Sequence, residues 1–345
     1  MNTLLMNQFP IPPHFNPLKV GEVWRVPYQK LAPEAESWAK KQNISVSAND
    51  KVNICLLLID VQNTFCIPDF ELYVRGETGT GAVEDNQRLC EFIYRNLGII
   101  TKIIPTLDTH NTMQIFHPIF WINKDGKHPI PAATNITLSD IEAGIWQVNP
   151  VVANSITQGD YGLLEKQVFH YVKKLSLDGK YPLTVWPYHS MLGGIGHALV
   201  SSVEEAIFFH GIARQTQTQF ELKGENPLTE NYSILRPEVL TGFDDQPIAD
   251  KNTNLIKQLL EYDAVIIAGQ AKSHCVAWTI DDLLTEINQV DRTLTRKIYL
   301  LADCTSPVVV PGVVDYTEQA NTAFKRFADA GMNMIKSTNE FVIEH

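Results

Sequence analysis

The stretch DAVIIAGQAKSHCVAWTIDDLL, residues 263–284, combines a strand pattern, a short polar loop and the start of a helix pattern. Residues 263–269 are apolar on both faces, as expected for a strand of a parallel sheet that helices cover on both sides. From Val276 to Ile287, apolar side chains recur at the spacing of one helix face. A strand followed directly by a helix is the repeating unit of α/β folds. The loop between the two elements holds Cys275.

Five further apolar runs of strand length alternate with helix patterns along the chain. These runs are ICLLLID (54–60), KIIPTLD (102–108), PLTVW (182–186), QFELKG (219–224) and KIYLLAD (297–303). Helix patterns occupy residues 199–210 and 320–328, and Gly331 closes the second one. The alternation predicts an α/β fold, a three-layer α/β/α sandwich with a central, mainly parallel sheet of about six strands.

Two stretches interrupt this alternation. Residues 1–50 contain PIPPHFNP and then PEAESWAKKQ, which predicts an extended N-terminal arm followed by a short helix. We expect this arm to wrap the core or a neighbouring subunit of a homo-oligomer. Residues 118 to about 180 contain the helical run LLEKQVFHYVKKL and predict an insertion, in the form of a lid, within one domain that spans residues 51–345.

Charge and composition exclude several classes of protein. The formal net charge is −11, and no cluster of Lys and Arg provides the basic surface that nucleic-acid phosphates require. The same charge argues against attachment to anionic membranes, and the longest apolar stretches are too short to span a bilayer. The segment MNTLLMNQFPIPPHF has no basic region of the kind that begins a signal peptide, so we expect a cytoplasmic protein.

The cysteines do not form a disulfide framework or a zinc-finger pattern. They are an odd set without CxxC spacing, Cys55, Cys66, Cys90, Cys275 and Cys304. Cys275 has two interpretations. It is either a small packed side chain or a nucleophile. If Ser273 caps the helix, Cys275 lies in the first helical turn, where free N–H groups and the helix dipole lower a thiol pKa.

Polar residues follow most of the predicted strands, and ligands of open parallel sheets bind beyond the carboxyl ends of the strands. These residues are Asp60, Asp108, His110, His189 and Lys223. A strand-end carboxylate such as Asp60 and a lysine such as Lys223 would together activate a thiol. Each of them alone has an ordinary alternative, a turn-forming aspartate or a solvated lysine.

The DTH segment, residues 108–110, carries a metal-ligand pattern. In an extended segment Asp108 and His110 point to the same side, where both could bind one cation. His189, preceded by a stiff Trp-Pro pair, would supply a third ligand and leave open positions for a substrate. His117 is either a further ligand or a residue at the edge of the insertion. The alternative for an isolated D-x-H is a hydrogen-bonded turn.

Five motifs, taken in sequence order, resemble those of the isochorismatase-like cysteine hydrolases, most closely the nicotinamidase-type amidases. The motifs are LLLIDVQNTFC (56–66), TLDTH (106–110), WPYHS (186–190), KGENPLTENYS (223–233) and AGQAKSHCV (268–276). Their order and spacing agree with the family over roughly residues 53–310, apart from the insertion.

The resemblance implies a catalytic triad of Asp60, Lys223 and Cys275. Cys275 would attack a carboxamide carbon and form a thioester acyl-enzyme, which water then hydrolyses. The backbone N–H groups of Ala271 and Cys275 would form the oxyanion hole, next to a cis peptide bond between Gln270 and Ala271.

The resemblance also implies a divalent transition metal, zinc or iron, bound by Asp108, His110 and His189. This metal would bind the pyridine nitrogen of a nicotinamide. Phe65 and Trp186 correspond to the aromatic walls of the substrate pocket. We expect His274, beside the nucleophile, to contact the substrate as well.

Two residues depart from the family pattern, since Ser273 replaces a common Asp and Ser190 replaces a Cys. The triad is intact, but a different ring or a bulkier amide becomes possible. We predict a metal-containing cysteine amidase that cleaves nicotinamide or a related small-molecule amide to the acid and ammonia. The alternatives are a metal-free hydrolase of the same fold acting on a carbamoyl or ureido compound, and a catalytically silent binding or scaffold protein.

Overall fold

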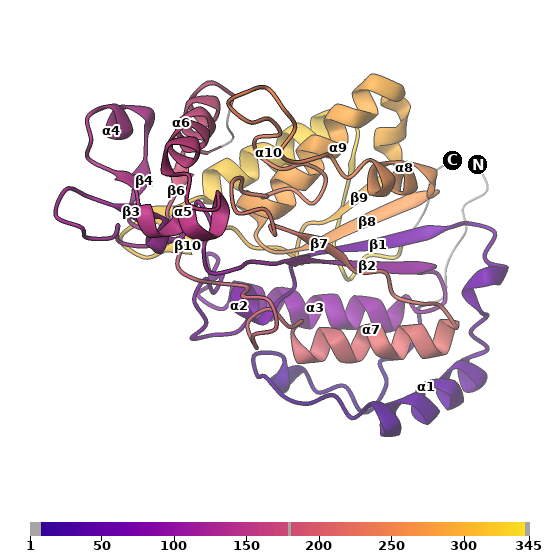
Figure 1. Ribbon diagram of the computed structural model, residues 1–345. Helices are drawn as coiled ribbons and strands as arrows, with labels where there is room; N and C mark the ends of the chain where they lie inside the picture. The colour runs from indigo at the N-terminus through magenta and orange to yellow at the C-terminus, as the bar shows by residue number, and fades with distance from the viewer. Residues whose placement is uncertain (1–7, 179–180, 342–345) are drawn as a thin grey trace. The chain divides into compact units, whose positions relative to one another are not determined.

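The computed structural model describes residues 8–178 and 181–341, and Figure 1 shows their elements. The chain divides into two compact units. The first unit is formed by residues 1–107, 198–221 and 253–345, and the second by residues 108–197 and 222–252. The predicted boundaries of an arm and an insertion, and the predicted homo-oligomer, stay predictions.

A six-stranded sheet forms the centre of the fold, in the order β12-β9-β8-β1-β2-β7. Its strands are β1 (Ile54–Ile59), β2 (Lys102–Asp108), β7 (Glu221–Lys223), β8 (Ala264–Gly269), β9 (Ile298–Leu301) and β12 (Asn333–Ile335). The pairs β1–β2, β1–β8, β8–β9 and β9–β12 are parallel. The predicted parallel α/β sheet is therefore confirmed.

The prediction that PLTVW (182–186) forms a strand of this sheet was wrong. Within PLTVW only β6 (Leu183–Thr184) is a strand, and it pairs antiparallel with β4 (Asn135–Ile136). The sixth strand of the central sheet is β12, a three-residue strand that lies outside the predicted apolar runs. Its residues are partly exposed or exposed, as is common at the edge of a sheet.

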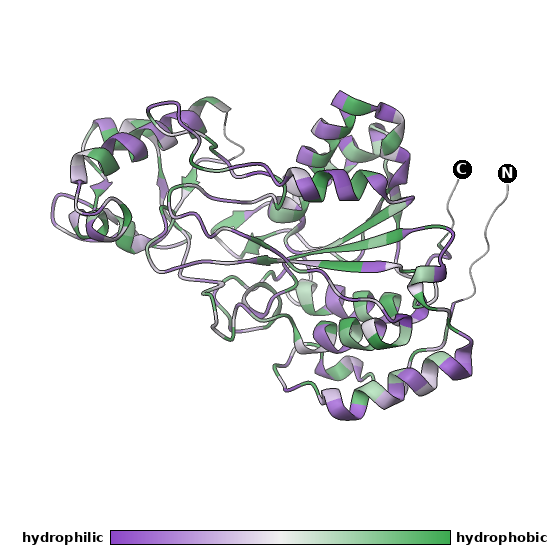
Figure 2. Cartoon of the chain, turned by 45° about the vertical axis from the view of Figure 1, so that its right-hand side comes forward, coloured by the Kyte–Doolittle hydropathy of each residue, from purple (hydrophilic) through white to green (hydrophobic). Residues whose placement is uncertain are grey.

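Helices of the first unit cover both faces of the sheet. Figure 1 shows α3 (Gly81–Arg95) and α7 (Ser201–Arg214) on one face, and α8 (Thr253–Glu261), α9 (Ala277–Val290) and α10 (Thr317–Asp329) on the other. Helix α1 (Tyr28–Gln42) packs against the outer side of α7. In Figure 2 the central strands are mostly hydrophobic, whereas the helices carry both colours. Every residue of β1 and β8 is buried, which confirms the three-layer sandwich.

The paired strands β1 and β8 end at the same level, since Ile59 lies opposite Gly269. Gly269 has a φ of +120°, and a Cβ atom there would lie 2.0 Å from the carbonyl oxygen of Ile59. Only glycine fits this close approach of two backbones. As a result, Asp60 and the QAKSHC loop both begin at one edge of the sheet.

The second unit has its own hydrophobic core, in which Trp121, Tyr171 and Val172 are buried. Its elements are η3 (Pro118–Phe120), β3 (Trp121–Ile122) paired with β5 (Gln147–Val148), the β4–β6 pair, α4 (Leu138–Glu142), α5 (Pro150–Ile156) and α6 (Tyr161–Asp178). The helix predicted in this stretch is α6, and two shorter helices accompany it.

The remaining short elements lie in the first unit. They are η1 (Pro17–Lys19), η2 (Ser47–Asn49), α2 (Asn63–Cys66), η4 (Lys272–Val276), η5 (Arg292–Lys297) and the hairpin of β10 (Val309–Val310) with β11 (Val314–Asp315). Among the described residues, no helix has the length and apolar character needed to cross a membrane.

Candidate active site

The predicted nucleophile lies where β8 passes into α9. Residues Lys272–Val276 form a π-helical turn, η4, that leads directly into the helix, and Cys275 lies in this turn with 9% of its surface exposed. The predicted helix cap at Ser273 was wrong. The Ser273 hydroxyl instead bonds to Nδ1 of His274 at 2.8 Å and accepts a bond from the Val308 N–H at 3.0 Å. Cys275 therefore lies in the π-helical turn just before α9, and not in the first turn of a helix capped by Ser273.

The backbone beside the predicted nucleophile has the form that the family resemblance implies. The peptide bond between Gln270 and Ala271 is cis. The N–H groups of His274 and Val276 both bond to the carbonyl of Ala271, at 3.0 and 3.2 Å. This tight turn brings Ala271 and Cys275, the two predicted oxyanion donors, into one short loop.

Asp60 lies at the end of β1 in a left-handed conformation, with a φ of 47°. Its N–H donates to Oγ1 of Thr106 at 3.1 Å, and the Thr106 hydroxyl donates to Oδ1 of Asp60 at 2.6 Å. Both residues are fully buried. Thr106, on the neighbouring strand β2, therefore sets the direction of the Asp60 carboxylate.

Two of the three predicted substrate-binding residues belong to the first unit. Phe65 is buried in α2. The His274 ring meets the ring of Tyr316 edge-on at a centroid distance of 4.7 Å. Burial lowers the pKa of His274 to about 3, so its imidazole is neutral at physiological pH.

Lys223, the predicted triad lysine, belongs to the second unit and is buried. Its Nζ donates to Oδ1 of Asp108 at 2.8 Å and to the carbonyl of Asn231 at 2.9 Å. Burial alone would raise the pKa of Asp108, but the adjacent His110 and Lys223 hold it well below its ordinary value. Asp108 is therefore an anion beside a cation.

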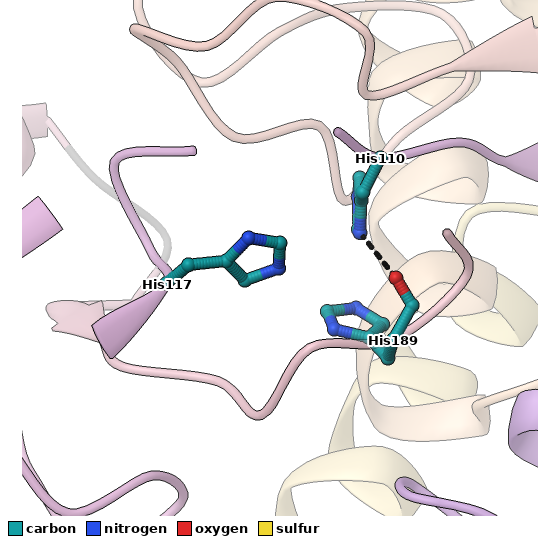
Figure 3. Close-up of side chains that lie close together, drawn as sticks. All are labelled: His110, His117 and His189. Carbon is teal, nitrogen blue, oxygen red and sulfur yellow. Dashed lines mark hydrogen bonds between the residues drawn. The ribbon is translucent and has the colours of Figure 1, made fainter. Parts of the chain in front are cut away.

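Three histidines of the second unit converge beside Asp108. Ligand atoms of His110, His117 and His189 all lie within 4.8 Å of one another. All three residues are buried. Figure 3 shows the His117 ring pointing towards the other two rings. The sequence predicts His110 and His189 as metal ligands and leaves the role of His117 open, and the structure places His117 in the same cluster.

The hydrogen bonds of these histidines fix which ring nitrogen carries the proton. Each Nδ1 lies beside a carbonyl oxygen, which only accepts: His110 beside His189 at 3.2 Å, His189 beside Pro187 at 2.7 Å, and His117 beside Thr112 at 3.0 Å. Each Nδ1 is therefore protonated, and a neutral ring presents a lone pair at Nε2. The His117 Nε2 is buried and has no hydrogen-bond partner among the described residues.

The position of Asp108 fits a bound cation. Its Oδ1 lies 3.0 Å from Nε2 of His110, and its Oδ2 lies 3.5 Å from Nε2 of His189. Burial lowers the pKa of His110, which favours the neutral ring there. Such a contact between a carboxylate oxygen and an imidazole nitrogen is favourable when a proton or a metal cation lies between them. Neutral imidazoles oriented by backbone carbonyls, together with one carboxylate, form a typical donor set for a transition metal.

A glycine makes room for this cluster. Gly224 has a φ of +86°, and a Cβ atom there would lie 2.8 Å from Nε2 of His110 and 3.0 Å from Oδ1 of Asp108. Any larger residue at position 224 would push into these two atoms. The glycine of the KGENPLTENYS motif is therefore required by the cluster.

Comparison with solved structures supports the fold. The yeast nicotinamidase Pnc1p bound to the inhibitor nicotinaldehyde matches with a TM-score of 0.51 and 17% identity, over 82% of this chain and 99% of that chain. The chain has the nicotinamidase fold. A nicotinamidase/pyrazinamidase of Acinetobacter baumanii matches with a TM-score of 0.46 and 18% identity, over 84% of this chain and 99% of that one. No model of a protein family and no curated protein sequence matches the chain.

Within this nicotinamidase fold, Trp186 has a partner that sequence reasoning missed. The Trp186 Nε1 donates to Oε1 of Glu230 at 2.9 Å, and the Glu230 N–H bonds to the Tyr171 hydroxyl at 3.3 Å. Burial raises the pKa of Glu230 well above its ordinary value. Burial thus favours the protonated form of Glu230, and its hydrogen bond orients Trp186, the predicted aromatic wall of the substrate pocket.

Proposed function

We propose that this protein is a metal-containing cysteine amidohydrolase that cleaves a carboxamide, nicotinamide or a related amide, to the acid and ammonia. The observation that carries the proposal is the set of three buried imidazoles beside Asp108, each with its Nδ1 bonded to a backbone carbonyl. This arrangement favours the metal-dependent form over a metal-free hydrolase. The shared fold with a nicotinamidase that binds nicotinaldehyde supports a substrate with a pyridine ring.

Asp108, His110 and His189 would hold the metal, with His117 as a fourth ligand. The donor set of three nitrogens and one carboxylate suits zinc or iron. When bound, the metal would supply a Lewis-acid contact for the ring nitrogen of the substrate.

The reacting groups would be Cys275, Asp60 and Lys223. Asp60 would accept the thiol proton of Cys275, and the cation of Lys223 would stabilise the charges of both partners. The thiolate would attack the carboxamide carbon, ammonia would leave with a returned proton, and a thioester would remain on Cys275. Water would then hydrolyse the thioester and release the acid.

The oxyanion that forms during each attack would bind to the N–H groups of Ala271 and Cys275. Two such preorganised donors are worth about 3 kcal/mol of barrier each. Phe65, Trp186 and His274 would line the substrate pocket. The neutral His274 ring would contact the substrate without adding a charge to it.

An ammonia-release screen tests this function. Purified protein, loaded separately with Zn²⁺ and Fe²⁺, would be assayed with nicotinamide, pyrazinamide, a carbamoyl compound and a ureido compound. We expect ammonia from at least one aromatic carboxamide, and loss of that activity after a chelator removes the metal. Release from ureido or carbamoyl compounds alone, unaffected by the chelator, would support the metal-free hydrolase instead. No release from any compound by the metal-loaded protein would favour the silent binding protein.

A further inference from the structure

Gln270, the residue that precedes the predicted oxyanion donor Ala271, has a fully engaged side chain. It is 1% exposed, and its Nε2 donates to Oδ2 of Asp85 at 2.8 Å. Its Oε1 accepts a bond from the Ser306 N–H at 3.3 Å, and its own N–H donates to the carbonyl of Ile59 at 2.8 Å. Gln270 is therefore held from three directions, by α3, by β1 and by the segment after β9.

Asp85, on α3, is itself tightly held. It is 2% exposed, and its Oδ1 accepts a bond from Nη2 of Arg88 at 2.8 Å. The Ser306 hydroxyl also donates to the Asp85 carboxylate. Arg88 in turn donates from Nε to the carbonyl of Asp303. The carboxylate thus faces Gln270 with little freedom to turn.

The segment of residues 304–308 completes the support of the nucleophile loop. The Gly269 N–H bonds to the Cys304 carbonyl at 3.1 Å, and the Lys272 N–H bonds to the Ser306 carbonyl at 2.8 Å. Between these two backbone bonds, the Gln270 side chain takes up the Ser306 N–H. The Gln270 side chain therefore adds a third hydrogen bond to the two backbone bonds that join the nucleophile loop to residues 304–308.

We propose that Asp85 and Gln270 are positioning residues that fix the direction of the Ala271 N–H group. The inference rests on the proposed function, in which this N–H binds the oxyanion. The Gln270 amide has only one satisfactory orientation, because turning it over would place its oxygen against the Asp85 carboxylate and its NH₂ against the Ser306 N–H. Asp85 thereby determines the orientation of the Gln270 backbone and of the peptide unit that follows it.

An apolar side chain would fill this space without the cost of burying polar groups. A buried polar network that is fully satisfied instead fixes one geometry, and small errors in oxyanion-donor direction reduce catalysis. The role of Asp85 and Gln270 is therefore to position the Ala271 N–H group, and not merely to fill space in the core.

Nicotinaldehyde and nicotinate together test this role. The Cys275 thiol adds across the aldehyde carbonyl: an Sγ–C bond forms, the π electron pair moves to the oxygen, and the thiol proton passes to Asp60. The adduct therefore uses the oxyanion donors, whereas the planar acid nicotinate does not require them. A change in the direction of an oxyanion donor will therefore weaken inhibition by nicotinaldehyde and leave inhibition by nicotinate unchanged.

The test variant is Gln270→Leu, which keeps the size and removes both side-chain hydrogen bonds. We expect kcat to fall about tenfold or more with KM within about threefold, and nicotinaldehyde inhibition to weaken about tenfold while nicotinate inhibition stays within about threefold. The matched control is Gln258→Leu in α8, where the amide bonds to Gln219; its kinetics should equal those of the unsubstituted protein.

The milder variant Asp85→Asn keeps one carbonyl oxygen and serves if Gln270→Leu does not fold. We expect it to change kcat and nicotinaldehyde inhibition in the same direction by a smaller factor. If Gln270→Leu, or Asp85→Asn in its place, weakens inhibition by nicotinate and by nicotinaldehyde equally, or changes neither, the positioning role is overturned while the proposed function stands. If the unsubstituted protein neither turns over an amide nor binds nicotinaldehyde through Cys275, the proposed function fails and the inference fails with it.

Discussion

Asp108 and Lys223 form a buried ion pair, with the Lys223 Nζ donating to Oδ1 of Asp108 at 2.8 Å. The same oxygen lies 3.0 Å from Nε2 of His110. One carboxylate thus serves both the predicted triad lysine and the predicted metal cluster. Because removing one partner of a buried ion pair leaves the other charge uncompensated, the predicted metal cluster and the lysine depend on each other.

Replacing the shared carboxylate should affect metal binding first. We expect Asp108→Ala to lower the metal content of the purified protein to well below one ion per chain, as measured by elemental analysis. The control is Asp125→Ala in an exposed turn of the same unit, which should keep the metal. Full metal occupancy in Asp108→Ala would refute its assignment as a ligand.

His117 is the candidate ligand that only the structure brings into the cluster. Within the part of the chain that the structure describes, its buried Nε2 has no hydrogen-bond partner. Burial lowers the pKa of His117 to about 3, so the ring is neutral and its Nε2 can bind a metal. We expect His117→Ala to weaken zinc affinity by about 10- to 100-fold in a chelator competition, a range seen when metal-site partners are removed. His128→Ala, in the same unit but outside the cluster, should leave the affinity unchanged. Equal affinities in the two variants would show that His117 is not a ligand.

The space at Gly224 gives a steric test of the cluster. Gly224→Ala and Gly193→Ala both place a Cβ on a backbone with positive φ, +86° and +80°, so both cost backbone energy. Only at position 224 would the Cβ meet atoms of the predicted metal ligands, since no atom of the described residues lies within 4 Å of it at position 193. We expect Gly224→Ala to lose metal and activity while Gly193→Ala keeps both. Equal losses in the two variants would contradict the steric reason.

Glu205 predicts how stability depends on pH. Burial, with a contribution from Glu34, raises its pKa from 4.5 to about 7. The folded state therefore binds this proton more tightly than the unfolded state, and the free energy of unfolding falls as the pH rises from about 4.5 to about 7.

Urea unfolding at pH 5 and pH 8 measures this effect. The free energy of unfolding should fall less between pH 5 and pH 8 in Glu205→Gln than in the unsubstituted protein, by about 1 to 3 kcal/mol, because the amide does not ionise. The exposed Glu22→Gln should show the same loss as the unsubstituted protein. A loss in Glu205→Gln as large as in the unsubstituted protein would contradict the raised pKa.

The strands and the strand-end residues could be predicted because their signals are local. The buried runs of β1 and β8 are apolar throughout, and parallel strands bring Asp60 and the cysteine loop to one edge of the sheet. Strand β12 and the pairing of Leu183 could not be predicted, because short apolar segments do not specify their partners.

The missed features depend on contacts between residues far apart in the sequence. Ser273 resembles a helix cap, but the Val308 N–H, 35 residues away, bonds to its hydroxyl. The Gln270 amide meets Asp85 across 185 residues, and Trp186 meets Glu230 across 44. A buried glutamine or glutamate has no sequence signature of its own, so only the fold reveals these pairs.

Trapping the covalent intermediate tests the proposed reaction most directly. Metal-loaded protein would be mixed with nicotinamide, quenched in acid during turnover and examined by mass spectrometry, with ammonia measured in parallel. We predict an acyl group on Cys275 together with ammonia release, and neither of them in a folded Cys275→Ala variant, whereas Cys90→Ala retains both. Ammonia release by Cys275→Ala at the rate of the unsubstituted protein would contradict the proposed nucleophile.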